Sequence, residues 1–281
     1  MRHYVARPPT PPLAKCVEYV WASQGAPAHA KERVVPTGTL ELLVNLVEGE
    51  GRIYAAGRDQ SFSGAAVSGA YRRPFSFDTR ENASVVGVHF RPGYAGVVLG
   101  VPPDELVDRH VPLDALWGRR ARELRERLCA ATTTTQRFAL LEAELASRLD
   151  ERRVHPAVGY ALDALAQPQA RVADIAKCAG LSQRRLIEVF TAAVGITPKR
   201  FGRVLRFHRA TALARSAVLD WTRIAHECGY YDQAHLIRDF RELADATPSE
   251  LMRASAHPKE PHQFAMPEGS ILSKRNLPRG A

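Results

Sequence analysis

The 281-residue chain is poor in cysteine, and its four cysteines are widely scattered. Cys16, Cys129, Cys178 and Cys228 form no CxxC pair and have no spacing typical of a disulfide framework or a zinc site. We therefore expect reduced thiols, most of them buried as small apolar residues. No apolar run approaches the roughly 20 residues needed to span a bilayer, and the opening MRHYVARPPTPP lacks the apolar stretch of a secretory signal. The sequence thus favours a cytoplasmic protein with no membrane partner.

Motifs of the common enzyme classes are missing as well. The sequence holds no GxSxG, no P-loop, no HExxH and no GxGxxG after a predicted strand. His226, Cys228 and His235 lie near one another in the sequence, but no fourth ligand for a metal is evident. We therefore expect no catalytic residues, no metal and no cofactor.

The chain does contain a basic excess and ample apolar material. Hydrophobic residues make up 45% and charged residues 25%, which with this length predicts about two globular domains. The formal net charge is +9. The stretch 196–215 carries Lys199 and five arginines and not one acid. A local positive stripe of this kind permits nucleic acid as a partner without proving it.

The N-terminal half has the pattern of a small antiparallel β domain. From about residue 34, short apolar or alternating runs such as LELLVNLV and SVVGVHF are divided by Gly, Pro, Asn or Asp. Helical spacing begins at Arg91-Pro92-Gly93 and continues to about residue 150. The polar residues of this half that are candidates for contact with an effector are Glu41, Asn45, His89 and Arg91.

Composition also predicts where the parts of the chain begin and end. The first thirty residues are proline-rich and predict an irregular lead-in, apart from a strand at KCVEYVWA. ERRVHP, residues 151 to 156, predicts a hinge between the halves. Past residue 254 the chain is polar and proline-rich, which predicts a disordered tail. The expected division is an N-terminal domain over 1–150, a helical domain over 151–254 and a tail over 255–281.

The basic half contains an internal repeat. DIAKCAGLSQRRLIEVFTAAVGITP, residues 174 to 198, resembles RIAHECGYYDQAHLIRDFRELADATP, residues 223 to 248. Gly180 recurs forty-nine positions later and Phe190 fifty positions later, so one residue is inserted after the glycine. Each copy predicts a helix-turn-helix, because it supplies a small residue at the helix crossing and a glycine that tolerates positive φ in the turn.

The second helix of each unit presents a polar outward face. Ser182 and Asp232 are suitable N-caps for these helices. Gln and Arg can donate pairs of hydrogen bonds to base edges, Glu can accept from cytosine, and Ile can touch a thymine methyl. The outward residues, candidates for contact with DNA bases, are Gln183, Arg184, Ile187 and Glu188 in the first helix and Gln233, Ala234, Ile237 and Arg238 in the second.

A basic helix is predicted between the two units. Thr197-Pro198 is an N-cap followed by proline at the first helical position, and apolar residues follow on one face to about Ala214. Seventeen residues at ~1.5 Å each give roughly 26 Å. With the flanking units, this length can set two helices near the ~34 Å between successive major grooves. The candidate phosphate contacts are Ser182, Lys199, Arg200, Arg203, Arg206, Arg209 and Arg241.

Over about residues 155 to 254 the chain resembles the AraC/XylS class of bacterial transcription regulators. The resemblance is carried by the two units, their fifty-residue offset, the GYYDQAHLIRDF element and the ATPSEL close. In that family each second helix enters a major groove, which implies this role for the eight outward residues. Ala234 departs from the family's usual larger polar residue. VVPTGTLELLVNL resembles part of the small sensing or dimerising domains attached to some members, which implies an effector or partner role for residues 1–150.

The sequence therefore predicts an α+β protein, in which a small β-rich domain precedes an all-α domain with two helix-turn-helix units joined by a long helix. The predicted function is sequence-specific binding of double-stranded DNA in transcription regulation. The expected partner is a DNA operator, and further candidate partners are RNA polymerase, an unknown small-molecule effector and a second copy bound through the N-terminal domain. Two alternatives stay open: an adaptor that does not contact DNA bases, and an enzyme domain tethered to a DNA-binding domain.

Overall fold

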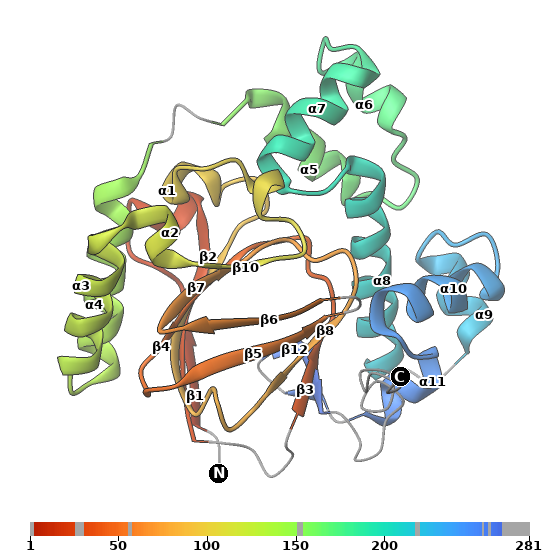
Figure 1. The fold of residues 1–281 in the computed structure, drawn as a ribbon. Coiled ribbons are helices and arrows are strands. Elements are labelled where there is room, and N and C mark those ends of the chain that lie inside the picture. The colour runs from red at the N-terminus through yellow and green to blue at the C-terminus, as the bar shows by residue number, and fades with distance from the viewer. Residues whose placement is uncertain are drawn as a thin grey trace, which may run out of the picture.

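The computed structural model of the protein describes residues 3–25, 31–55, 58–150, 154–216, 220–254, 256–257 and 260–265. Within these ranges two antiparallel sheets pack face to face in the N-terminal part, and helices build the C-terminal part (Figure 1). The predicted α+β class, with a β-rich domain ahead of a helical one, is confirmed.

The first sheet has the strand order β1-β2-β9-β4-β7-β10. Its strands are β1 (His3–Arg7), β2 (Val17–Gln24), β4 (Glu41–Asn45), β7 (Ala65–Ser68), β9 (Ser84–Phe90) and β10 (His110–Pro112). The strand predicted at KCVEYVWA is β2, but β1 also lies within the first thirty residues. The prediction of an irregular lead-in is therefore wrong there, because the β1 backbone pairs along its whole length with β2.

The second sheet has the strand order β11-β12-β3-β8-β5-β6. Its strands are β3 (Lys31–Val34), β5 (Glu50–Ala55), β6 (Arg58–Ser63), β8 (Phe75–Asp78), β11 (Ala256–His257) and β12 (Glu260–Ala265). The backbone of β12 pairs with the edge of β3, where hydrogen-bonding groups would otherwise stay open. The disordered tail predicted from residue 255 is corrected for β11 and β12, and the remainder of that tail lies outside the described residues.

Helices cover the outer face of the first sheet. They are η1 (Leu13–Lys15), α1 (Gly96–Leu99), η2 (Pro103–Leu106), α2 (Leu113–Trp117), α3 (Arg119–Ala130) and α4 (Thr134–Arg148). The run of four threonines at 132–135 contains the start of α4, which begins at a capping box formed by Thr133 and Gln136. Arg7 of β1 makes two hydrogen bonds, of 2.8 and 2.9 Å, to the buried Glu142 carboxylate, which ties β1 to α4.

The C-terminal part consists of two short helix pairs held by a long helix. Its helices are α5 (Pro156–Leu165), α6 (Val172–Cys178), α7 (Gln183–Val194), α8 (Pro198–Ser216), α9 (Trp221–Glu227), α10 (Gln233–Ala244) and α11 (Pro248–Arg253). The expected hinge over 151–156 falls partly outside the described residues, and α5 begins at its last position. None of the helices in the described ranges is both long and apolar enough to cross a membrane.

One hydrophobic core runs through both parts of the molecule. It begins on the helix-facing side of the first sheet, with residues such as Leu42 and Val88, and continues without interruption to Val158, Phe207 and Phe240 in the C-terminal helices. The two parts are therefore packed on each other. Figure 1 shows α8 running alongside the sandwich, with α6 and α7 at one end and α9 and α10 at the other.

Candidate nucleic-acid interface and N-terminal cavity

Each helix-turn-helix unit turns at a glycine with a left-handed backbone. Gly180 after α6 has a φ of +67°, and Gly229 after α9 has a φ of +77°. In both units the N–H of the next residue donates to a carbonyl of the first helix, that of Ala176 or Ala225, at 2.9 Å. Both alanines are buried, as a close helix crossing requires. The sequence repeat therefore corresponds to the same local geometry formed twice.

The second helix of each unit is capped as predicted. The Ser182 hydroxyl accepts from the third backbone N–H of α7 at 3.2 Å, and the Asp232 carboxylate accepts from that of α10 at 2.6 Å. Thr247 and Glu250 form the capping box expected ahead of α11. These caps fix where α7, α10 and α11 begin.

The outward face of α7 carries an exposed ion-pair cluster. Gln183, Arg184 and Glu188 are exposed, and Ile187 is half-buried. Glu188 accepts from Arg184 at 3.0 Å and from Arg185 at 3.4 Å. These hydrogen bonds hold the pKa of the Glu188 carboxyl below its usual range. Exposed ion pairs of this kind exchange readily with water, so Arg184 and Glu188 stay accessible to a ligand. Gln183 is accessible because it is exposed, and Ile187 is accessible in part.

The outward face of α10 is less engaged. Gln233, Ala234 and Arg238 are exposed, and Ile237 is half-buried. The Gln233 side chain lies 3.4 Å from the Thr222 hydroxyl. Within the part of the chain that the structure describes, Arg238 makes no hydrogen bond or ion pair with another side chain. Its guanidinium therefore has its full set of donors available to a partner outside the chain.

Two of the predicted phosphate contacts are held instead in a half-buried ion-pair cluster between α8 and α10. Arg203 lies 2.6 Å from the Asp239 carboxylate and 2.5 Å from that of Glu242, and Arg200 lies 2.7 Å from Glu242. The hydrogen bond from Arg203, with that from Arg200, lowers the pKa of Glu242 to about 2. Arg200 also donates to the backbone carbonyl of Arg72 in the N-terminal part. The acids that hold these arginines come from α10, outside the acid-free stretch, so sequence reasoning missed them.

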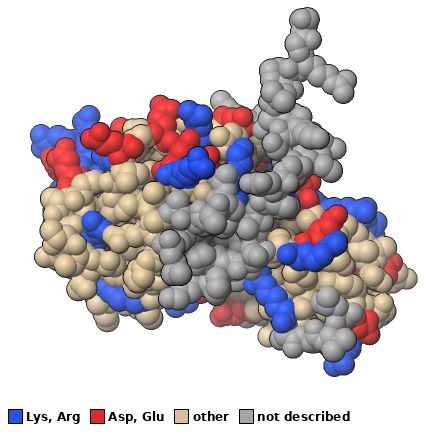
Figure 2. Space-filling model, turned by 90° about the horizontal axis from the view of Figure 1, so that it is seen from below, with Lys and Arg blue, Asp and Glu red and all other residues tan. Residues whose placement is uncertain are grey.

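The other basic candidates divide into engaged and exposed residues. Arg209 donates to the carbonyl of Ala166 at 2.6 Å, and the Arg206 guanidinium lies 5.6 Å from the centre of the Tyr230 ring. Lys199 and Arg241 are exposed, like the N-cap Ser182. On the face of the molecule in Figure 2, basic and acidic side chains are interspersed. The basic excess is thus partly used for internal contacts.

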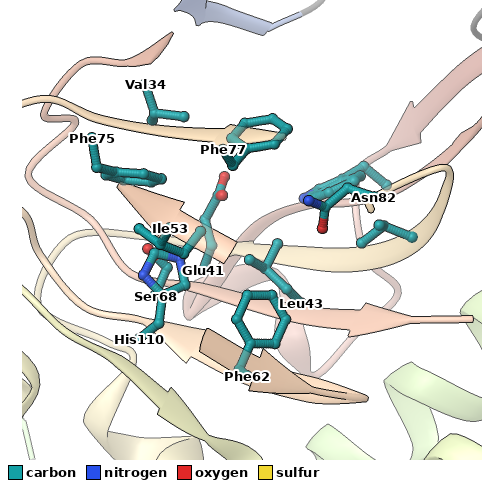
Figure 3. A pocket seen from close by; sticks show the side chains of 12 residues that line it. Val34, Glu41, Leu43, Ile53, Phe62, Ser68, Phe75, Phe77, Asn82 and His110 are labelled. Carbon is teal, nitrogen blue, oxygen red and sulfur yellow. The ribbon is translucent and has the colours of Figure 1, made fainter. Parts of the chain in front are cut away.

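A cavity separates the two sheets of the N-terminal part. Its empty volume is about 510 Å³, including the part open to solvent. Its apolar wall includes Trp21, Leu43, Ile53, Phe62, Phe75 and Phe77. Its polar lining consists of Glu41, Ser68, Asn82 and His110 (Figure 3).

The structure brings one of the four predicted effector residues to this cavity and places a second directly behind it. Glu41 lines the wall. His89, on the neighbouring strand β9, does not line it, but its Nδ1 lies 2.7 Å from a Glu41 carboxylate oxygen. Asn45 instead donates to the carbonyl of Glu81 at 2.7 Å, and Arg91 donates to the carbonyl of Ala14 at 3.1 Å. These two side chains hold loops, and they are not part of the cavity wall.

His110 is a cavity residue that the sequence did not single out. It is 5% exposed, and burial lowers the pKa of its imidazole to about 3, against a small opposing effect of the Glu41 charge. Its Nδ1 lies 2.7 Å from the Tyr71 hydroxyl. A histidine at the start of HVPL gives no signal in the sequence, because its neighbours Glu41 and Tyr71 come from distant parts of the chain.

Two family models match the chain. Residues 175–254 match a family described as a helix-turn-helix domain, and residues 6–112 match a family described as a domain of unknown function (DUF6597). The first match covers both units and α8. The second covers the sandwich that contains the cavity.

A transcriptional regulator is also similar to part of this chain. An uncharacterised HTH-type transcriptional regulator of Haemophilus influenzae is 26% identical over 117 residues, which are 41% of this chain and 38% of the relative. The match thus spans well under half of that relative's length.

Two solved structures are also similar to this chain over part or most of its length. An AraC-type transcriptional regulator from Chromobacterium violaceum is 26% identical over 34% of this chain and 88% of its own, with a TM-score of 0.32. The fatty-acid-bound ToxT from Vibrio cholerae is 9% identical over 88% of this chain and 94% of its own, with a TM-score of 0.45.

The family match over α6 to α11 agrees with the geometry of the two glycine turns and the two N-capped second helices. The relative from Haemophilus influenzae is described as a regulator of the same type. On these findings the C-terminal part of the chain contains an AraC-type helix-turn-helix domain of the kind found in transcriptional regulators.

Proposed function

We propose that this protein binds a specific double-stranded DNA sequence by inserting α7 and α10 into two successive major grooves. The observation that carries the proposal is that the two second helices expose equivalent positions, fifty residues apart, on equally capped frames. α8 joins them and is 19 residues long, which corresponds to ~28 Å. That length is suited to the ~34 Å spacing of major grooves on one side of B-DNA.

The accessible residues suggest a division of contacts. Gln183, Arg184 and Glu188 of α7, with Gln233 and Arg238 of α10, are exposed and have hydrogen-bonding groups suited to base edges. The half-buried Ile187 and Ile237 and the exposed Ala234 can add apolar contact with thymine methyl groups.

Phosphate contact is assigned to fewer residues than the sequence offered. Lys199, Arg241 and Ser182 at the start of α7 are exposed and are suited to the backbone. Arg200 and Arg203 would have to leave the carboxylates of Asp239 and Glu242 in order to contact phosphate. The cost of stripping Asp239 of its partner makes this exchange unfavourable, because its side chain is only 3% exposed.

The N-terminal domain is proposed to modulate DNA binding through the orientation of the two units. In the full chain the outward residues of α7 and α10 are exposed, so the domain does not cover them. It contacts both units instead: Arg33 of β3 donates to the carbonyl of Ala244 at the end of α10, at 2.8 Å, and η2 packs on α7. A second copy bound through this domain and RNA polymerase are proposed partners at the promoter.

Selection of bound sequences from a random double-stranded DNA pool tests the proposal. We expect one motif with two conserved blocks whose centres lie about one helical turn, roughly 10 base pairs, apart. A matched selection with Arg238→Ala should relax the preference in one block only. Recovery of unselected sequences by the wild-type chain would contradict the proposal and would favour an adaptor that does not contact bases.

A further inference from the structure

A row of polar side chains crosses the inner face of the first sheet. The strand register places Glu41 of β4 directly opposite His89 of β9 on one side and Ser68 of β7 on the other. Ser68 in turn is opposite His110 of β10, and His89 is opposite Tyr19 of β2. Because directly paired residues point to the same face of a sheet, these five residues form a continuous row across five strands.

The row lies where an apolar core would be expected. Ser68, His89 and His110 are each between 5 and 6% exposed. Burying polar groups in a sandwich interior costs free energy unless they are hydrogen-bonded. The apolar side chains around them do not form one core but two clusters, one with Ile53 and Phe62 and the other with Trp21. The cavity lies between these clusters, and both contribute to its wall.

His110 presents an unused hydrogen-bond donor in this interior. The Tyr71 hydroxyl accepts from the Gln60 amide at 3.2 Å and has its own hydrogen available for Nδ1 of His110, 2.7 Å away. The imidazole is neutral, because burial lowers its pKa to about 3, and in the tautomer that accepts this hydrogen at Nδ1 the ring proton resides on Nε2. Among the residues that the structure describes, Nε2 is buried without a hydrogen-bond partner.

The charge of the wall limits what can enter. Among the described residues that line the cavity, Glu41 is the one with a formal charge, and none of them is a lysine or arginine. A carboxylate or phosphate ligand would meet a negative charge with no cation to balance it, which is unfavourable in a half-buried site. Figure 3 shows the Glu41 carboxylate directed into the cavity beneath Phe77, with the His110 ring beside Ser68.

We infer that the cavity binds a small, uncharged aromatic molecule that carries a hydroxyl group. The ring packs between Trp21 and the phenylalanines of the opposite sheet. The hydroxyl donates to the Glu41 carboxylate and accepts from Nε2–H of His110, so that one group bridges two members of the polar row. The empty volume of about 510 Å³ includes space that is open to solvent, so a bound ring system extends toward that opening.

A regulatory role for this site rests on the proposed function, because the ligand would act on DNA binding. Few contacts connect the cavity to α8, the helix between the two helix-turn-helix units. Glu41 is bonded to His89, and His89 Nε2 lies 3.1 Å from the Thr39 hydroxyl. The loop that contains Thr39 contacts α8 through Pro36, whose carbonyl accepts from His208. Occupation of the cavity would therefore affect the packing of α8, the helix that fixes the relative position of the two units.

Equilibrium dialysis of the full chain, without DNA, tests the inference. The probes are naphthol, methylnaphthalene and naphthoate, substituted at the same ring position. We expect one naphthol per chain, bound at least about tenfold more tightly than either of the others, because only naphthol serves Glu41 and His110 together. Glu41→Gln and His110→Phe should each weaken naphthol binding about tenfold or more. Glu50→Gln, which removes an exposed carboxylate of β5 outside the cavity, should leave the binding unchanged.

Equal binding of naphthol and methylnaphthalene by the wild-type chain would overturn the inference, and so would tighter binding of naphthoate. Unchanged naphthol affinity in both cavity variants would do the same. The wild-type comparison decides even if a variant fails to fold. Because no DNA is present, a chain that binds naphthol but selects no DNA sequence would refute the proposed function alone.

Discussion

His208 of α8 donates from Nε2 to the carbonyl oxygen of Pro36, 2.7 Å away, in the loop between β3 and β4. Burial lowers the pKa of His208, which keeps the ring neutral with its proton on the nitrogen that faces the carbonyl. Two residues further along the loop, Gly38 packs directly against the ring of Phe201. The loop that begins β4 is therefore a structural connection between the sandwich and the helix that carries both units.

The contact between Gly38 and Phe201 gives the first prediction. A Cβ at Gly38 would lie 2.8 Å from the Phe201 ring, and Gly38 has a φ of +77°. Gly38→Ala should therefore lower the free energy of unfolding by the cost of the strained backbone, about 1 to 2 kcal/mol, and further by displacement of the ring. Urea unfolding measures this change.

Gly180→Ala is the matched control for this experiment. Gly180 has a φ of +67°, close to that of Gly38, but a Cβ there meets nothing within 4 Å. Its substitution should cost only the backbone strain. If both variants lose the same free energy of unfolding, the loop does not pack tightly on α8. Phe201→Ala itself should cost about 3 to 5 kcal/mol, because the ring is buried. In that background Gly38→Ala should cost less than in the wild-type chain, because the smaller side chain leaves room for the Cβ.

The buried imidazole of His110 predicts a pH dependence of stability. Its pKa is lowered from 6.5 to about 3 in the folded chain, so the unfolded chain binds the proton more readily. The stabilising effect is complete above pH 6.5 and is lost as the pH falls toward 3. Between pH 7 and pH 5 the loss should be about 2 kcal/mol, at about 1.4 kcal/mol per pH unit below 6.5. Urea unfolding at the two pH values measures it.

His110→Phe should remove the part of this difference that is due to His110, whatever its effect on stability at pH 7, and leave the part due to His208, whose pKa is also lowered by burial. His3→Phe, which changes an exposed histidine of β1, should retain the full difference. An unchanged pH dependence in His110→Phe would show that this imidazole is not held neutral by burial.

The ion pairs of Arg203 predict that its substitution lowers stability, whereas substitution of the exposed Arg241 lowers DNA affinity. Arg203→Met leaves the buried Asp239 carboxylate without its partner, which should cost about 3 to 5 kcal/mol of the free energy of unfolding. Arg241→Ala removes an exposed side chain of α10 and should change stability by less than about 0.5 kcal/mol. Thermal or urea unfolding of the two variants measures the contrast.

Arg203→Met and Arg241→Ala should differ in the opposite sense in the salt dependence of DNA binding. Arg241→Ala should reduce the slope of log affinity against log salt concentration by about one unit, as for the loss of one phosphate contact. Arg203→Met, which removes the charge, should keep the wild-type slope when it is assayed below its unfolding temperature. A reduced slope for Arg203→Met would return Arg203 to the phosphate-contacting set.

Local signals in the sequence predicted the local structure well. The repeat determines the turns at Gly180 and Gly229 and the caps at Ser182 and Asp232, because each depends on residues within a few positions along the chain. The fold class followed from the change of periodicity near Arg91. These features need no knowledge of how distant segments pair.

Contacts between distant segments were not predictable in the same way. The row from His89 through Glu41 to His110 depends on the order and register of strands that are not consecutive, and a shift of one residue would turn a strand's side chains to the other face. Helical periodicity likewise placed Arg203 among exposed arginines, since its partner Asp239 lies 36 residues later on a helix whose packing angle the sequence does not state.

Arg238 and Arg184 provide the sharpest test of which helix contacts bases most strongly. Both are exposed, but at different positions of the repeat, because Arg184 is equivalent to Ala234 and Arg238 to Glu188. Arg184 is bonded to Glu188, whereas Arg238 has no such partner among the described residues. Arg238→Ala should weaken binding to the selected operator by about 1 to 3 kcal/mol and relax the preference at one base pair. Arg184→Ala should cost less, because binding through Arg184 must first break its ion pair.

Titration of both variants against the operator and against each single-base-pair change in it measures these effects. If Arg238→Ala loses affinity for the unchanged operator but not for operators already altered at one base pair, the variant no longer distinguishes the four base pairs at that position. This result would identify direct base contact by Arg238. An equal loss on every sequence would instead assign Arg238 to phosphate. A larger loss for Arg184→Ala than for Arg238→Ala would mean that the pair with Glu188 positions Arg184 for base contact, since pre-organised donors lose less entropy on binding than free ones.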